Sequence, residues 1–317
     1  MPIVSVVIPL YNKGPHIALA IQSILNQTEQ NFEIIIVDGQ STDKGPKVVQ
    51  SFKDQRIFFF EQKGSGVSSA RNEGICNSQS DFIAFLDADD EWMPDHLETL
   101  LRLRKKHPEA GAYTTAYLVK YPNSKIKIAD FYAVPEEPWE GLLPSYFKSA
   151  AFGNPPVWTS VVGISKQILT EMNGFNTEKR WGEDTDLWGR IALKYPIAFS
   201  WNGMGIYHTE ASNRACNRIE PVQDVFVILA RNAIDTGEFS PEMINDLREY
   251  AAKRQIVTAW QNIKARRSDL ARDILKNCKT QNRKRLKYLT LFSTYIPYSI
   301  VCVIINMKRQ IMEFIGD

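Results

Sequence analysis

The sequence predicts an α/β protein whose sheet is covered by helices on both faces, followed by a helical C-terminal extension. Two observations carry this prediction. Strand-like apolar runs and helix-like segments alternate four times before Asp87, which is the rhythm of βα units in a parallel sheet. From about Pro221 onward the pattern is helical to the end. We therefore expect an α/β domain over residues 1–215 and a helical region over residues 216–317.

Local patterns justify each element in turn. The β-branched run 3–8, ended by Pro9, predicts a buried strand, and apolar residues at helical spacing predict a helix over 16–25. Short apolar runs, apolar residues at helical spacing and the turn residues between them also predict the other strands and helices. We expect strands at 32–37, 56–60 and 82–86, helices at 46–52 and 66–76, then extended segments at 110–120, 125–134, 157–165 and 197–208, and a helix that opens at Gly182.

Composition narrows the class of protein. The chain has 317 residues, of which 44% are hydrophobic and 23% charged, which excludes a disordered chain and a polytopic membrane protein. The formal net charge is +2, yet residues 248–309 hold 15 Lys and Arg against 3 Asp and Glu. The cysteines form no zinc or redox motif, and the N-terminus lacks the features of a signal peptide. We expect a cytoplasmic protein with a basic C-terminal region.

An acidic turn gives the strongest local signal for chemistry. Asp87, Asp89 and Asp90 directly follow an apolar strand, and open α/β sheets bind ligands at the carboxyl ends of their strands. Three adjacent carboxylates repel one another unless a cation lies among them. Oxygen ligands suit Mg²⁺ or Mn²⁺, which commonly share their coordination with substrate phosphates. The turn predicts a divalent-cation site, and the alternative is a solvated turn in which Asp90 caps the next helix.

Three other side chains lie at the ends of predicted elements. Asp184 lies in the first turn of a helix, whose dipole favours the ionised carboxylate that a general base needs, although capping alone explains this pattern. Asp38 ends the second strand close to Tyr11, so the two could bind a base by hydrogen bonding and stacking. A turn Asp bonded to its own backbone is the alternative. His208 could supply a nitrogen ligand to a metal, although a lone histidine is more often structural.

Taken in order, these motifs resemble the inverting glycosyltransferases of family 2, which act in bacterial polysaccharide and cell-envelope synthesis. The resemblance covers about residues 2–212 and implies the GT-A fold, a Rossmann-like mixed sheet with flanking helices. Single motifs are modest signals, but their shared order makes chance agreement improbable. The segments that carry the resemblance are 4–13, 20–28, 34–38, 41–43, 70–74, 85–90, 173–175 and 182–187.

The resemblance implies a role for individual residues. Many relatives have a second acidic residue where this chain has Gly39, which leaves the identity of the donor's base open. The implied roles are Pro9, Tyr11, Asp38 and Arg71 in the nucleotide pocket, Asp87 at the ribose or beside the metal, Asp89 as the ligand of the divalent cation, Asp184 as the catalytic base, and His208 near the metal or the diphosphate.

The implied reaction moves one sugar from a nucleotide-diphosphate sugar, with UDP expected, to a hydroxyl of a glycan or lipid-linked acceptor. The metal would stabilise the leaving diphosphate while Asp184 accepts the acceptor's proton, so that one displacement inverts the anomeric centre. A haloacid-dehalogenase-like phosphatase is an alternative, because its nucleophile motif is also a strand followed by Asp-x-Asp. Glu91 stands where that family has Thr or Val. A sugar-nucleotide-binding protein without turnover is the other alternative.

The C-terminal region contains an uncharged stretch over residues 288–307, with cations at both ends. Its length would allow a membrane span, but Pro297 and several polar residues interrupt it. Its flanking cations and tyrosines favour a helix that lies on an anionic membrane surface. Buried packing, an oligomer contact and a true span are the alternatives. We therefore expect the protein at the inner face of the cell membrane. No nucleic-acid-binding motif accompanies the basic residues, so we expect no binding of nucleic acid.

Overall fold

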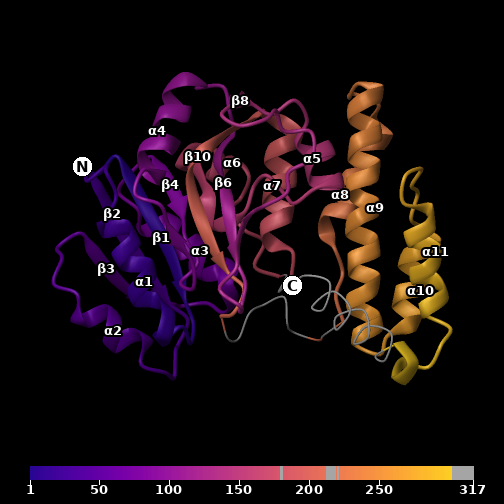
Figure 1. Ribbon diagram of the computed structural model, residues 1–317, viewed down its shortest axis with the longest axis horizontal. Helices are drawn as coiled ribbons and strands as arrows, with labels where there is room; N and C mark the ends of the chain where they lie inside the picture. Colours follow the sequence, from indigo (N-terminus) through magenta and orange to yellow (C-terminus); the bar gives the residue numbers. More distant parts are fainter. Residues whose placement is uncertain (179–180, 212–218, 220, 302–317) are drawn as a thin grey trace. The chain divides into compact units, whose positions relative to one another are not determined.

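The computed structural model describes residues 1–178, 181–211, 219 and 221–301. The chain divides into two compact units, residues 1–214 and 215–317, and each is described by itself. Figure 1 shows the first unit as a sheet with helices packed against it and the second as a group of helices.

One mixed sheet of ten strands forms the first unit within the described residues. Its strands are β1 (Val4–Leu10), β2 (Phe32–Asp38), β3 (Ile57–Glu61), β4 (Phe82–Phe85), β5 (Glu91–Trp92), β6 (Ala112–Lys120), β7 (Ile126–Ile128), β8 (Glu140–Leu142), β9 (Val162–Ser165) and β10 (Ile197–His208). The spatial order is β3-β2-β1-β4-β9-β6-β10-β5, with β7 beside β6 and β8 beside β10. β3, β2, β1 and β4 run parallel, whereas β9 is antiparallel to both of its neighbours.

Helices cover both faces of the parallel half. The helices of this unit are α1 (Gly14–Leu25), α2 (Gly45–Ser51), α3 (Gly66–Asn77), α4 (His96–Lys106), α5 (Tyr146–Phe152), α6 (Lys166–Glu171) and α7 (Glu183–Lys194). Val4, Val6 and Ile8 of β1 pack in one core cluster with apolar residues of α1 and α4. Val7 points to the other face, where it lies against Gly74 of α3. Alternating side chains of one strand thus fix the helices of both layers.

The predicted fold class is confirmed, and three details differ from the expectation. The strand expected at 125–134 ends after β7, and Phe131 packs instead against Tyr117 and Trp201. The segment expected as a strand at 157–165 begins with a 3₁₀ turn, Thr159–Val161, before β9. β5 and β8 were not predicted, because strands of two or three residues are too short to show a period.

The second unit is helical in its described residues, as predicted. Its helices are α8 (Val225–Thr236), α9 (Pro241–Lys264), α10 (Ser268–Lys276) and α11 (Lys284–Ser293), and α8, α10 and α11 all contact α9. Ile256 and Ile263 of α9 pack with Leu275 of α10. No helix in the described part is long and apolar enough to cross a membrane. Residues 302–307 of the uncharged stretch lie outside the described residues.

Candidate functional site

The carboxyl ends of β1, β2 and β4 meet at one edge of the sheet. The register pairs Leu10 of β1 with Asp38 of β2, and Pro9 with Val37. β4 runs parallel to β1 on its other side and leads into Asp87 two residues after it ends. The predicted residues Pro9, Tyr11, Asp38 and Asp87 are therefore brought to the edge where α/β sheets bind ligands.

Asp38 is buried at this edge, and its two oxygens differ in their partners. Oδ2 accepts a hydrogen bond of 3.1 Å from the backbone N–H of Ser41. Oδ1 is buried and has no hydrogen-bond partner in the described part of the protein. The turn interpretation therefore accounts for one oxygen only. Oδ1 can accept a hydrogen bond from an N–H of a bound nucleotide base. The Tyr11 side chain is 48% exposed, so its ring is available for stacking on that base.

Gln62 lies beside Gly39 and was not predicted as a site residue. The Gln62 side chain is buried, and its amide nitrogen donates to the carbonyl of Gly66 at 2.8 Å. A Cβ atom on residue 39 would lie 2.8 Å from Gln62 Oε1, so an acidic side chain there would require this amide to move. Gln62 thus fills the space beside Gly39 at the end of β2. A single polar residue after a strand gave no signal in the sequence.

Asp90 is the inward-facing member of the acidic turn. Its Oδ2 accepts from the Ser160 hydroxyl at 2.7 Å, and its Oδ1 accepts from the backbone N–H of His208 at 3.2 Å. Burial, and then the charges of Asp89 and Asp87, raise the pKa of Asp90 well above its ordinary value. The residue that caps α4 is Asp95, so the helix-capping alternative for Asp90 is wrong. Asp90 instead ties the turn to β10.

Asp89 is the carboxylate of the turn that fits a divalent cation. Its Oδ2 lies 2.6 Å from Lys13 Nζ, and its side chain is 16% exposed. Among the described residues, no group of three or more His, Cys, Asp or Glu side chains could hold a metal ion. Mg²⁺ is commonly bound by one or two carboxylates together with substrate phosphates. One carboxylate that already holds a cationic group fits that chemistry, with the other ligands coming from a donor's phosphates.

Arg71 joins the acidic turn to α7. This buried guanidinium donates to Asp87 Oδ1 at 2.8 Å and to Glu183 Oε1 at 3.1 Å, and it lies over the Phe175 ring. Burial lowers the pKa of Arg71, but the carboxylates of Asp87, Glu183 and Asp184 more than offset it, and the pKa lies above its ordinary value. The contacts of Arg71 therefore point to the two acidic motifs, whereas the sequence predicted it in the nucleotide pocket.

The first turn of α7 presents two neighbouring carboxylates in different environments. Gly182 precedes the helix with a left-handed φ of 74°, which glycine adopts without strain. Burial, and then the charge of Asp184, raise the pKa of Glu183, whose carboxylate is held by Arg71. Asp184 Oδ1 accepts from the backbone N–H of Thr185 at 2.6 Å, and Asp184 makes no ion pair within the described residues. Asp184 is thus the carboxylate of the two that is available for chemistry.

A loop between α6 and α7 is fixed from one side by Asn72 of α3. The Asn72 amide donates to the carbonyl of Phe175 at 2.8 Å and accepts from the N–H of Phe175 at 2.9 Å. Gly174 has a φ of 60°, and a Cβ atom there would lie 2.5 Å from Asn72 Oδ1. The Asn-Gly-Phe sequence at 173–175 therefore needs glycine at its centre for both conformation and space.

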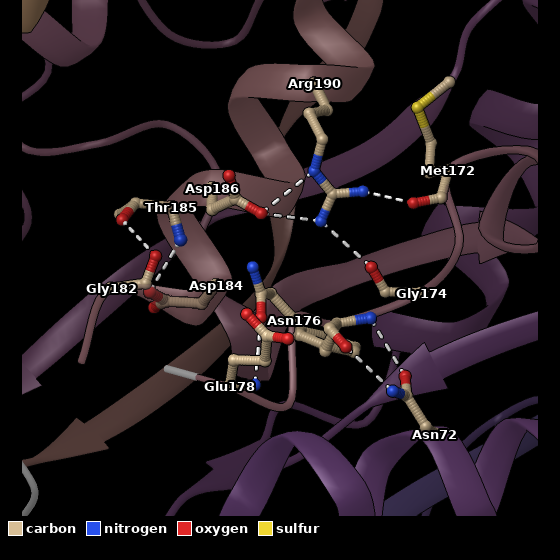
Figure 2. A network of polar contacts seen from close by, with 11 residues as sticks. Asn72, Met172, Gly174, Asn176, Glu178, Gly182, Asp184, Thr185, Asp186 and Arg190 are labelled. Atoms are coloured by element: carbon tan, nitrogen blue, oxygen red, sulfur yellow. Dashed lines mark hydrogen bonds and ion pairs between the residues drawn. The ribbon is translucent and has the colours of Figure 1, made fainter. Parts of the chain in front are cut away.

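Arg190 fixes the same loop from α7. Figure 2 shows its guanidinium between Asp186 and the carbonyls of Met172 and Gly174. Asp186 Oδ2 accepts from Arg190 at 2.7 Å. Neither Asn72 nor Arg190 was predicted as a site residue, because only the fold brings them to the same loop. Both side chains hold the segment that leads into the first turn of α7.

His208 lies buried at the end of β10, where both ring nitrogens face carboxylates. Nε2 lies 2.8 Å from Glu91 Oε1, and Nδ1 lies 3.0 Å from Glu210 Oε1. The hydrogen bond to Glu91, with help from Glu210, raises the pKa of His208 against the effect of burial. The predicted metal role would require one ring nitrogen to lose its proton and leave its carboxylate, while the other could keep its partner. That role stays a prediction.

Comparison of the sequence with known families and proteins gives a consistent result. The family described as glycosyl transferase family 2 matches residues 5–169. An uncharacterized glycosyltransferase of Rickettsia conorii is 34% identical over 196 residues, which are 61% of this chain and 31% of that protein. The putative teichuronic acid biosynthesis glycosyltransferase TuaG of Bacillus subtilis is 36% identical over 116 residues, 36% of this chain and 46% of that protein. The chain thus matches about a third of the length of the Rickettsia relative.

Solved structures share the fold at low sequence identity. The TarS 1–349 structure from S. aureus in complex with UDP-GlcNAc has a TM-score of 0.69 and 14% identity, covering 93% of this chain and 89% of that one. The mannosyltransferase PcManGT from Pyrobaculum calidifontis, in complex with GDP-Man and Mn²⁺, has a TM-score of 0.60 and 20% identity, covering 94% and 82%. The fold is that of the GT-A glycosyltransferases.

The raised pKa of His208 predicts a pH-dependent stability. Because the folded-state pKa lies above the ordinary value of 6.5, the stabilisation is complete below that pH and is lost as the pH rises through the raised value. As the pH rises above 6.5, we expect the free energy of unfolding to fall more steeply in the parent protein than in His208→Gln. Urea unfolding at several pH values measures this difference. Equal slopes for the two proteins would contradict the assignment.

Proposed function

The chain belongs to glycosyl transferase family 2, and from this premise we propose that it transfers one sugar from a nucleotide-diphosphate sugar to a hydroxyl group, with inversion at the anomeric carbon. UDP is the expected nucleotide, and a glycan or a lipid-linked glycan of the cell surface is the expected acceptor. The similarity to TuaG, a putative teichuronic acid biosynthesis enzyme, supports a role in polymer synthesis, and the UDP-GlcNAc complex of TarS supports a UDP-sugar donor. Family membership removes the basis of the phosphatase alternative.

The observation that carries this proposal is the pair of bonds made by Arg71. One buried guanidinium contacts Asp87 at the sheet edge and Glu183 beside the candidate base. The residues expected to bind the donor and the residue expected to activate the acceptor are thereby held by the same group. A displacement reaction needs this, because donor and acceptor must meet in a defined geometry.

Donor binding is assigned to the edge formed by β1 and β2. The unpartnered Oδ1 of Asp38 would accept a hydrogen bond from the N–H of the base, and the exposed Tyr11 ring would stack on the base next to Pro9. Gln62 would lie within the same part of the pocket, because its amide fills the space beside Gly39. Asp87, which Arg71 holds in place, would face the ribose.

Proton removal from the acceptor is assigned to Asp184. Its carboxylate would take the hydroxyl proton while the hydroxyl oxygen forms its bond to the anomeric carbon, and the electron pair of the breaking bond would leave with the diphosphate. Glu183 holds the first turn of α7 through Arg71, and the helix dipole favours the negative charge of Asp184 there. A cation at Asp89, Mn²⁺ or Mg²⁺, would act as a Lewis acid on the leaving group. A single displacement needs no covalent intermediate.

Substitution of the base tests this division of roles. Asp184→Asn keeps the side chain's shape but removes the proton acceptor, so we expect the turnover number to fall by about 10²–10⁴-fold with donor affinity changed less than about threefold. Release of the nucleoside diphosphate measures turnover, and calorimetry measures donor affinity.

Glu178→Gln is the matched control for that variant. Glu178 is an exposed carboxylate six residues before the base, and its neutralisation should leave turnover within about twofold. Near-normal turnover in Asp184→Asn would refute its role as base. Donor binding without any turnover in the parent protein would favour the sugar-nucleotide-binding alternative.

A panel of nucleotide sugars tests the donor and the metal together. A bound ligand stabilises the folded state by mass action, about 2.7 kcal/mol at a hundred times its dissociation constant, so one donor should raise the melting temperature most. We expect Mn²⁺ to add to this rise in the parent protein and in Asp95→Asn, but not in Asp89→Ala. A Mn²⁺ effect of the same size in Asp89→Ala would exclude Asp89 as the ligand.

A further inference from the structure

A basic cavity lies in the C-terminal unit, between the middle of α9 and the start of α11. Its volume is about 400 Å³, and Arg248, Lys279, Lys284 and Lys287 line it together with Tyr288. None of the side chains described as lining it is acidic. Four cations around one hollow repel one another unless an anion lies among them. The cavity therefore has the charge and size of a site for a phosphorylated group.

The backbone around this cavity is held by internal hydrogen bonds. Glu249, fully buried on α9, accepts from the Thr280 hydroxyl at 2.7 Å and from the N–H of Gln281 at 2.6 Å. The Glu249 carboxylate is therefore hydrogen-bonded to the loop that precedes α11 and does not face the cavity cations as a free charge. Lys287 Nζ donates to the carbonyl of Cys278 at 2.8 Å, which fixes one of the lining cations. Lys279 and Lys284 remain exposed at the rim.

Positive charge is crowded at this end of α9. Burial, and then the neighbouring cations Arg283 and Arg254, lower the pKa of Lys253 to about 8. Burial also lowers the pKa of Arg283. Glu249 partly offsets this effect on Arg283, and Arg254 pairs with Asp224 at 2.6 Å. An anion bound nearby would relieve this crowding.

An exposed apolar face of α11 lies next to the cavity. Tyr288, Leu289 and Phe292 are 61%, 55% and 64% exposed. Phe292 follows the other two by four and three residues, which places all three along one side of the helix. Tyr295, just after the helix, is also exposed. Tyr288 belongs both to this face and to the cavity lining. Exposed aromatic and aliphatic residues grouped in this way mark an interaction surface.

We propose that the cavity binds the phosphate headgroup of an anionic membrane lipid while the apolar face of α11 enters the membrane interface. Charge complementarity selects this occupant, because a lipid surface offers phosphates directly above an apolar layer. The cations and the apolar side chains lie next to one another at Tyr288, which matches that layering. The proposal concerns the C-terminal unit alone and does not depend on the proposed transfer reaction.

Vesicle binding by the full chain tests the proposal. We expect the protein to bind phosphatidylcholine vesicles that contain 30 mol % phosphatidylglycerol, and to bind pure phosphatidylcholine at least about tenfold more weakly. Lys279→Gln combined with Lys284→Gln should weaken binding by about thirtyfold, since each cation near an anionic surface contributes about fivefold. Leu289→Ser combined with Phe292→Ser should weaken it as well. Flotation at constant salt measures all of these affinities.

The matched control is Arg267→Gln combined with Lys276→Gln. It removes the same charge from the same unit at residues that do not line the cavity and that pair with neighbouring aspartates on the surface. We expect its vesicle affinity to change by less than about threefold. Because vesicle binding needs no turnover, the result is independent of any effect on transfer.

Four outcomes would overturn the proposal. The first is failure of the parent protein to bind anionic vesicles, and the second is an equal loss of affinity in the cavity and control variants. Binding of free inorganic phosphate or diphosphate without binding of vesicles would assign the cavity to a soluble anion. A change in molecular mass in Leu289→Ser with Phe292→Ser, with vesicle affinity unchanged, would assign the apolar face to a second copy of the chain.

Discussion

A buried guanidinium needs negative partners, and this requirement organises the functional edge of the sheet. Arg71 satisfies it with Asp87 after β4 and Glu183 at the start of α7, two residues far apart in sequence. Loss of both partners would leave a buried charge uncompensated, at a cost of about 3–5 kcal/mol. The acidic turn and the helix that carries Asp184 are thus constrained together, and neither can shift without the other. The two ion pairs of Arg71 set the position of the acidic turn relative to α7, and the other contacts of the site refine it.

The contacts behind the site hold backbone, while the groups in front of it are left for chemistry. Asn72 and Arg190 bind the carbonyls and amide of the loop before α7 from two sides. Asp90 binds an amide of β10 and the Ser160 hydroxyl. Each of these polar side chains has partners within the protein, whereas no other described side chain forms a hydrogen bond or ion pair with Asp38 Oδ1 or with Asp184. Such preorganisation lets a site act without rearranging its own dipoles.

The sequence predicted those parts of the fold and site that depend on local pattern. β1, β2 and β4 are apolar runs, and the polar residues after them, Asp38 and Asp87, therefore lie at the carboxyl edge. Hydrogen bonds and ion pairs between residues far apart in the sequence produce no local pattern, so they could not be predicted. The resemblance implied that Arg71 lies near the nucleotide's base, but its contacts with Asp87 and Glu183 were not predicted. Lys13, which pairs with Asp89, had no predicted role either. Gln62 and Arg190 were missed for the same reason, since a periodic pattern reports burial but not the identity of a distant partner.

The lone oxygen of Asp38 has a consequence for selectivity. It has already lost most contact with water in the folded protein, so a ligand that donates a proton to it gains a hydrogen bond without a further loss of hydration. A nucleoside whose ring nitrogen is methylated has no N–H at that position, so Asp38 Oδ1 would stay buried without a hydrogen-bond donor in the complex. Sites of this kind reject a ligand that lacks the donor by far more than the difference in its size would suggest. If the donor's base binds here, this atom would favour bases with a ring N–H, such as uracil or guanine, over bases without one, such as cytosine or adenine.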